Sequence, residues 1–154
     1  MRTRTILLTL AACFLGATAA LAADAHVGTW KLNSAKSKFT PGAAKNDTVI
    51  VEVAGDNMKV TVDGTESDGR AAHNTWTGKF DGKDYPVTGD PASDMRSYTK
   101  VNDRTLTLVL KKGGKVTTTG RIALSADGKS RTVTTTGTDP QGKKVASTAV
   151  YDKQ

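Results

Sequence analysis

The sequence predicts an all-β protein folded as a single antiparallel up-and-down β-barrel of eight to ten strands. Apolar and polar residues alternate with a period of two over 48–53, 58–63 and 105–110, which is typical of strands with one buried face. After the first twenty-odd residues no helical period is visible. Turn residues recur at intervals of about 8–14 residues, as in an antiparallel meander. They are Gly55-Asp56-Asn57, Asp68-Gly69, Asp81-Gly82, Asn102-Asp103, Gly113-Gly114, Asp127-Gly128 and Pro140-Gln141-Gly142.

The alternating runs between these turns define the expected strands in chain order. A meander this long removes its free edges best by closing into a barrel. A two-sheet sandwich is the competing architecture, although it usually needs longer crossover connections. One long connection, Ser34 to Asn46, is expected to form a loop at the rim. The expected strands are 27–33, 47–54, 58–65, 72–80, 84–88, 95–101, 104–112, 115–125, 130–138 and 143–152.

The N-terminus has the pattern of a secretory signal peptide. Arg2 and Arg4 precede an uncharged run over 6–20, and Ala20-Leu21-Ala22 forms a small-x-small cleavage site. We therefore expect a signal peptide over 1–22, a mature domain over 23–154, and a periplasmic or secreted protein. A membrane anchor is the alternative, but the run is barely long enough and is diluted with Ala, Thr and Gly. Lipidation at Cys13 is a further alternative, although the apolar run continues beyond it.

Composition narrows the function classes. The net charge of +7 falls to +5 once Arg2 and Arg4 are removed, and the basic residues are scattered rather than gathered on one face. With Cys13 removed, the mature chain has no disulfide and no thiol nucleophile. A nucleic-acid partner is not expected, because it would require a continuous basic surface with interleaved aromatic residues. We expect no membrane span after signal removal, and a monomer.

Short motifs at both ends of the chain resemble calycin proteins. Gly28-Thr29-Trp30 resembles the G-x-W element that opens lipocalin barrels, and 147–152 is similar to the closing strand of fatty-acid-binding proteins. Three further segments, 30–33, 35–39 and 85–89, resemble small secreted bacterial lipocalin-like proteins. The resemblance covers nearly the whole mature chain and implies a lipocalin-like barrel. It implies no particular activity.

Two departures from the fatty-acid-binding proteins bear on function. Their closing strand carries an Arg two residues before the Tyr, and that pair holds the lipid carboxylate. Here Ala149 occupies the Arg position while Tyr151 matches. The resemblance therefore implies weak binding of long-chain fatty acids. The 34–46 connection is also too short for the two-helix lid of that family, which implies a more open mouth.

The candidate ligand-binding residues are four aromatic side chains and one arginine of the expected strands. Trp76 and Phe80 are expected to face inward with Gly78 leaving space between them, either as core or as a ligand wall. The remaining candidates are Tyr98, Arg131 and Tyr151. Other inward positions are expected to be small or polar, which predicts a narrow, partly polar cavity. They are Asn74, Ser97, Thr99, Thr118, Thr135 and Ser147.

Arg131 has two alternative roles. It shares a phase with Val133, so it is expected on the apolar face of its strand, where a buried guanidinium needs a partner. The resemblance to lipocalins implies that it packs across Trp30 and closes the barrel base. Alternatively it binds an anion inside the cavity. Gly28 and Trp30 are expected to be structural.

Signals for catalysis and for metal binding are weak. His26 and His73 each lack a second His or acid at ligand spacing, so we expect no metal, no cofactor and no catalytic residue. The leading interpretation is an exported protein that binds an amphipathic or weakly polar molecule in a barrel cavity. One alternative is a protein-binding module that uses the loops Ser34–Asn46 and Tyr85–Asp94. A barrel isomerase or lyase using Tyr98, Tyr151 and Arg131 is another.

Overall fold

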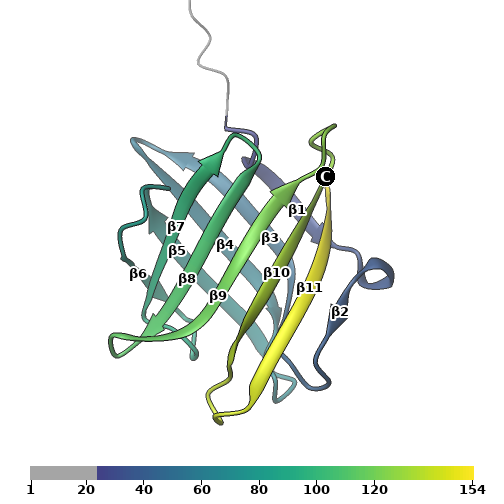
Figure 1. Cartoon of the computed structure of the whole chain (residues 1–154), viewed down its shortest axis with the longest axis vertical. Coiled ribbons are helices and arrows are strands. Elements are labelled where there is room, and N and C mark those ends of the chain that lie inside the picture. Colours follow the sequence, from purple (N-terminus) through teal and green to yellow (C-terminus); the bar gives the residue numbers. More distant parts are fainter. Residues whose placement is uncertain (1–23) are drawn as a thin grey trace, which may run out of the picture.

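The computed structural model describes residues 24–154, and the expected signal peptide lies outside this range. The described chain forms one antiparallel sheet with a single short 3-10 helix (Figure 1). The elements are β1 (Gly28–Leu32), η1 (Ser34–Lys36), β2 (Lys38–Phe39), β3 (Lys45–Ala54), β4 (Asn57–Thr65), β5 (Ala71–Gly78), β6 (Tyr85–Thr88), β7 (Met95–Asn102), β8 (Thr105–Lys112), β9 (Lys115–Leu124), β10 (Ser130–Thr138) and β11 (Lys144–Lys153).

The sheet closes on itself into a barrel, which confirms the predicted fold class. Strand β1 pairs with β3 on one side, with Trp30 opposite Val49, and with β11 on the other, with Leu32 opposite Tyr151. From β3 to β11 every strand pairs with its neighbour in sequence. In Figure 1, β7 to β11 form the near wall, and β1 with β3 to β5 form the far wall. This closure excludes the two-sheet sandwich.

All ten predicted strands are present, with ends that differ by at most two residues from the expected ones. The difference lies in the 34–46 connection, which was expected to be only a rim loop. It contains η1 and the two-residue strand β2, which pairs with β11 through Phe39 opposite Ser147. Asn33 begins η1 because its side chain accepts a hydrogen bond from the Lys36 amide at 3.2 Å. Ser37 and residues 40–44 are the parts of this segment that remain outside a helix or strand.

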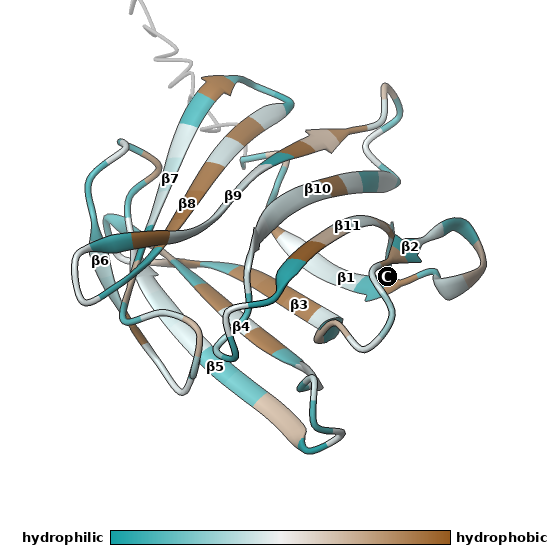
Figure 2. Cartoon of the chain, turned by 60° about the horizontal axis from the view of Figure 1, so that its bottom comes forward, coloured by the Kyte–Doolittle hydropathy of each residue, from teal (hydrophilic) through white to brown (hydrophobic). Residues whose placement is uncertain are grey.

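The alternation of side chains places the apolar residues inside the barrel. Figure 2 shows apolar bands interrupted by paler or polar ones along β3 and β8. This pattern is that of strands with one face packed and one face in water. The buried apolar residues form one cluster: Trp30, Val49, Val51, Val60, Val62, Trp76, Val87, Tyr98, Leu106, Leu108, Ile122, Leu124, Ala149 and Tyr151.

Trp30 closes one end of the barrel, as predicted. Its side chain is fully buried, and its indole N–H donates to the carbonyl of His26 at 2.9 Å. The guanidinium of Arg131 lies 4.7 Å from the ring centroid, and the ammonium of Lys153 lies 5.1 Å from it. The expected contact between Arg131 and Trp30 is therefore confirmed. A large ring under two cations makes this end a packed floor.

Position 28 lies at this same end, and its backbone conformation requires glycine. Its φ of +139° is in a region that side-chain-bearing residues rarely adopt. A Cβ atom at this position would lie 2.6 Å from Cε of Lys153. The glycine thus lets β1 begin beside the C-terminal end of β11, so that Trp30 can enter the floor.

Candidate ligand cavity

A cavity of about 230 Å³ lies inside the barrel, between the Trp30 floor and the loops at the opposite end. Its lining includes Ala43, Glu66, Asp90 and Pro140, which belong to four different connections between strands. Because alternate connections of a meander lie at the same end, these loops surround one mouth. The cavity is slightly smaller than the roughly 300–1,000 Å³ typical of drug-sized ligands.

The walls combine an apolar middle with hydroxyl and amide groups. Asn74, Thr118, Thr135 and Ser147 line the cavity, as the strand phase predicted. The hydroxyls of Thr135 and Ser147 are 2.7 Å apart, so they satisfy one another. This partly polar lining confirms the expected character of the interior. The apolar wall is made by Val49, Val62, Leu108, Ile122, Val133 and Ala149.

Three of the five predicted ligand residues, Tyr98, Arg131 and Tyr151, line this cavity together. Arg131 and Tyr151 are directly opposite one another on β10 and β11, and the guanidinium lies 5.2 Å from the tyrosine ring. The Tyr151 hydroxyl donates to the Asn46 carbonyl at 3.0 Å. Its oxygen can still accept a hydrogen bond.

The electrostatics of this trio follow from burial. Arg131 is 4 % exposed, and this burial lowers the pKa of its guanidinium to about 10, opposed by the nearby Tyr151 and Tyr98. Burial also raises the pKa of the Tyr151 phenol to about 12. At neutral pH, Arg131 is therefore a cation and Tyr151 is a neutral hydroxyl.

Trp76 and Phe80 do not line the cavity, so their expected role as a ligand wall finds no support in the lining. Trp76 is buried, with its indole N–H donating to the Arg96 carbonyl at 2.8 Å, and its ring stacks on Phe80 with centroids 6.2 Å apart. Phe80 lies beyond the end of β5, which stops at Gly78. The two rings pack in the core, which was the favoured of the two interpretations, with the ligand wall as its alternative.

Gly78 does not leave open space between these rings, which corrects the prediction. A Cβ atom there would lie 2.5 Å from Cγ of Tyr85 and 2.7 Å from the Trp76 ring. Tyr85 packs edge-on against Trp76 at 5.8 Å. The ring of Tyr85 therefore fills the space that a side chain at position 78 would need.

The inward phase of β7 was also assigned incorrectly for Ser97 and Thr99. The structure turns Arg96 and Tyr98 toward the cavity, while Ser97 and Thr99 are absent from its lining. Thr99 instead bridges to Asp81 in the connection between β5 and β6. Ser97 is buried without lining the cavity, so burial and an inward direction do not coincide at this position.

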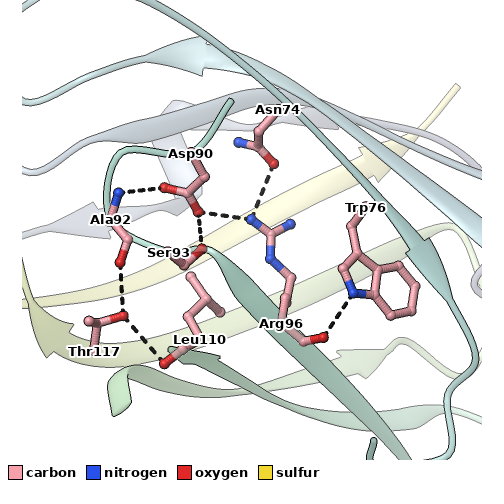
Figure 3. A network of polar contacts seen from close by, with 8 residues as sticks. All are labelled: Asn74, Trp76, Asp90, Ala92, Ser93, Arg96, Leu110 and Thr117. Atoms are coloured by element: carbon pink, nitrogen blue, oxygen red, sulfur yellow. Dashed lines mark hydrogen bonds and ion pairs between the residues drawn. The ribbon is translucent and has the colours of Figure 1, made fainter. Parts of the chain in front are cut away.

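Arg96 was missed by the sequence analysis and belongs to a buried polar network beside the cavity (Figure 3). Its guanidinium donates to Asp90 at 3.0 Å and to Asn74 at 3.2 Å. Both Arg96 and the Asp90 carboxylate are largely buried, so the ion pair is little screened by water. The shared phase of Arg96 and Tyr98 was the signal that could have identified it.

The β6–β7 connection is held by the same Asp90. Its carboxylate accepts hydrogen bonds from the Ala92 amide at 2.8 Å and from the Ser93 hydroxyl. The Thr117 hydroxyl lies 3.1 Å from the Ala92 carbonyl and 3.3 Å from that of Leu110 (Figure 3). These contacts fix one side of the mouth. The predicted loop Tyr85–Asp94 is thus an ordered part of the cavity wall.

The two histidines occupy different environments. His73 is exposed, and its Nδ1 lies 2.6 Å from a carboxylate oxygen of Asp63 on the neighbouring strand. His26 is fully buried, and within the described chain neither of its ring nitrogens has a hydrogen-bond partner. Burial lowers the pKa of His26 to about 4. Residues 24–154 contain no group of three His, Cys, Asp or Glu side chains that could hold a metal.

The fold and the cavity define a closed antiparallel β-barrel with an internal cavity. Neither the protein-family models nor the curated proteins give a match. Two similar solved structures are a redesigned β-barrel, mFAP1, bound to DFHBI, and EF1p2_mFAP2b bound to DFHBI. The first is 17 % identical, covers 84 % of this chain and 95 % of its own, and has a TM-score of 0.43. The second is 15 % identical, with 86 % and 97 % coverage and a TM-score of 0.47.

No helix within residues 24–154 is long and apolar enough to cross a membrane.

Proposed function

We propose that this protein binds a small organic molecule inside its barrel. One observation carries the proposal: the cavity is enclosed by a packed floor at Trp30 and is reached through loops at the other end. Its walls join an apolar surface to a few directed polar groups, which is the usual composition of small-molecule sites. Tyr98, Arg131 and Tyr151 are among these polar groups, and Arg131 packs on the Trp30 floor.

The protein-binding alternative is less well supported. A module that uses its rim loops would be favoured by a filled interior and exposed aromatic rings at the rim. The interior instead contains a cavity, and the rim segments contribute Phe39 and Asp90 to its lining. Within residues 24–154, the contacts of Tyr98, Tyr151 and Arg131 do not favour the chemistry of an isomerase or lyase.

The proposal includes export to the periplasm or the exterior, as a monomer that captures its ligand there. The supporting observation is the pattern of the leader over 1–22. Asp24, close to the expected cleavage site, pairs with Lys100 at 3.3 Å. Cleavage before Asp24 would therefore leave the N-terminus against the barrel.

Native mass spectrometry of protein purified from its source organism without denaturation tests this function. The expected spectrum contains a monomer carrying a non-covalent molecule that is lost on collisional activation. The mass of the bare chain should correspond to an N-terminus at Ala23 or Asp24. A chain that begins at Met1 contradicts export, as does an acylated Cys13. A wild-type chain that is always empty and binds no small molecule on titration contradicts the carrier function.

A further inference from the structure

Arg131 is the one buried cation at the cavity wall that lacks an acidic partner within the described chain. Arg96, the other arginine in the lining, is paired with Asp90 at 3.0 Å. None of the ion pairs among residues 24–154 includes Arg131, and its Nε has no hydrogen-bond partner. Stacking on Trp30 and Tyr151 stabilises the guanidinium but leaves its charge uncompensated.

A buried charge without a counter-ion is costly, and a bound anion would remove that cost. The guanidinium is a planar fork of donors that matches the two oxygens of a carboxylate. Tyr98 lines the same part of the cavity, and no hydrogen bond of its hydroxyl occurs within residues 24–154. One cation and one hydroxyl donor therefore line the same cavity, and Tyr98 is near enough to Arg131 to influence the pKa of the guanidinium.

The rest of the cavity restricts the class of anion. Val62, Leu108, Ile122 and Val133 surround the space with hydrocarbon, which requires an apolar body. The mouth carries the carboxylates of Glu66, Asp90 and Asp139, and burial together with Asp90 raises the pKa of Glu66. A second negative charge on the ligand would lie among these acids. The net positive charge of the mature chain favours the approach of anions from solution.

We propose that the ligand is a small organic monoanion whose charged group binds Arg131 and Tyr98 and whose apolar body fills the cavity. This inference rests on the proposed function and specifies its ligand. It differs from the carboxylate capture implied by the fatty-acid-binding resemblance, because the position of that family's arginine is Ala149. The cation comes instead from β10, opposite Tyr151.

Calorimetric titration with three molecules of equal chain length, octanoate, 1-octanol and octylamine, tests the inference. Wild type should bind octanoate at least roughly tenfold more tightly than octanol, the gain expected for a charge-assisted hydrogen bond, and octylamine most weakly. Arg131→Gln should bring octanoate to the affinity of octanol and leave octanol unchanged. Arg121→Gln removes the same charge from an exposed outward position on β9 and should preserve the preference.

Two further variants keep the test valid if Arg131→Gln does not fold. Arg131→Lys keeps the charge without the fork, and Tyr98→Phe keeps the ring without the hydroxyl. Each substitution should weaken the binding of octanoate severalfold and change the binding of octanol little. Equal binding of octanoate and octanol by wild type would overturn the anion inference and leave the carrier function standing. A preference that survives in Arg131→Gln would assign the anion to another group. If none of the three molecules binds, both proposals fail.

Discussion

Arg131 lies over Trp30, with its guanidinium 4.7 Å from the centre of the ring, and this contact joins the last strands of the barrel to the first. Arg131 belongs to β10 and Trp30 to β1, and β11 lies between them and pairs with both strands. One side chain therefore serves two surfaces. It packs on the floor of the barrel, and it presents a cation to the cavity above.

Trp30→Ala should destabilise the protein by about 3–5 kcal/mol, the range for removing a large buried aromatic side chain. The loss combines the apolar contacts of the ring with the hydrogen bond from its indole N–H to His26. Urea unfolding monitored by circular dichroism measures the change. A loss below about 1 kcal/mol would contradict the burial of Trp30 and its role as the floor.

The buried His26 should make stability depend on pH. Burial lowers the pKa of folded His26 to about 4, whereas the unfolded value is near 6.5. Between these values the unfolded chain binds the proton more readily, so stability falls as pH decreases from 6.5 to about 4. The full loss from this group is on the order of 3 kcal/mol. Above pH 6.5 this residue contributes no pH dependence.

The matched variant is His26→Phe, because the ring keeps its packing edge-on to Phe80 and loses two unpaired nitrogens. It should be more stable than wild type, and the difference between the two should grow as pH falls from 6.5 to 4. Thermal unfolding at several pH values provides the comparison. A constant difference across that range would show that His26 is accessible to protons in the folded state.

The ion pair between Arg96 and Asp90 should be costly to break from one side. Asp90→Ala leaves Arg96 buried without its carboxylate, which typically costs about 3–5 kcal/mol. The double variant Arg96→Met with Asp90→Ala should recover part of this loss, because no uncompensated charge remains. A double-mutant cycle measured by chemical unfolding isolates the pair. Additive losses would mean that the two side chains do not interact in solution.

Gly78→Ala tests whether the space at this position is occupied. The added methyl group would lie 2.5 Å from the ring of Tyr85, so the aromatic cluster must shift, at a cost of about 1–3 kcal/mol. Thr77→Ala, at the exposed neighbour on the same strand, should change stability by less than about 0.5 kcal/mol. Equal effects of the two substitutions would restore the sequence-based prediction of open space beside Gly78.

The alternation of side chains predicted the strands because a period of two is a local property of the sequence, and the closure was predicted because a long meander removes its free edges by forming a barrel. The contact of Arg131 with Trp30 followed from the same phase and from the lipocalin resemblance, and the structure confirms it. The inward direction of Arg131 and Tyr151, which both line the cavity, was predicted for the same reason, whereas the phase assigned to β7 placed Ser97 and Thr99 inward in place of Tyr98. These features depend on which face a residue occupies.

The incorrect assignments depend on contacts between distant segments. Phase alone could not show that Tyr85 fills the space at Gly78, or that Asp81 of the β5–β6 connection bridges to Thr99. Arg96 was missed because the phase of β7 was assigned with Ser97 inward, and its partner Asp90 lies in a loop, where no periodicity indicates which way a side chain points. The boundary between core and cavity near Trp76 likewise depends on how the aromatic rings stack.

The most direct test of the binding cavity is to fill it from one residue. Ala149 is buried on β11 and lines the cavity, and Thr148 beside it points outward and is exposed. Octanoate and octanol are titrated by calorimetry into Ala149→Phe and Thr148→Phe, with folding of each checked by circular dichroism. Ala149→Phe should abolish binding of both molecules, and Thr148→Phe should bind them as wild type does. Undiminished binding by a folded Ala149→Phe would place the ligand outside the barrel and contradict the proposed function.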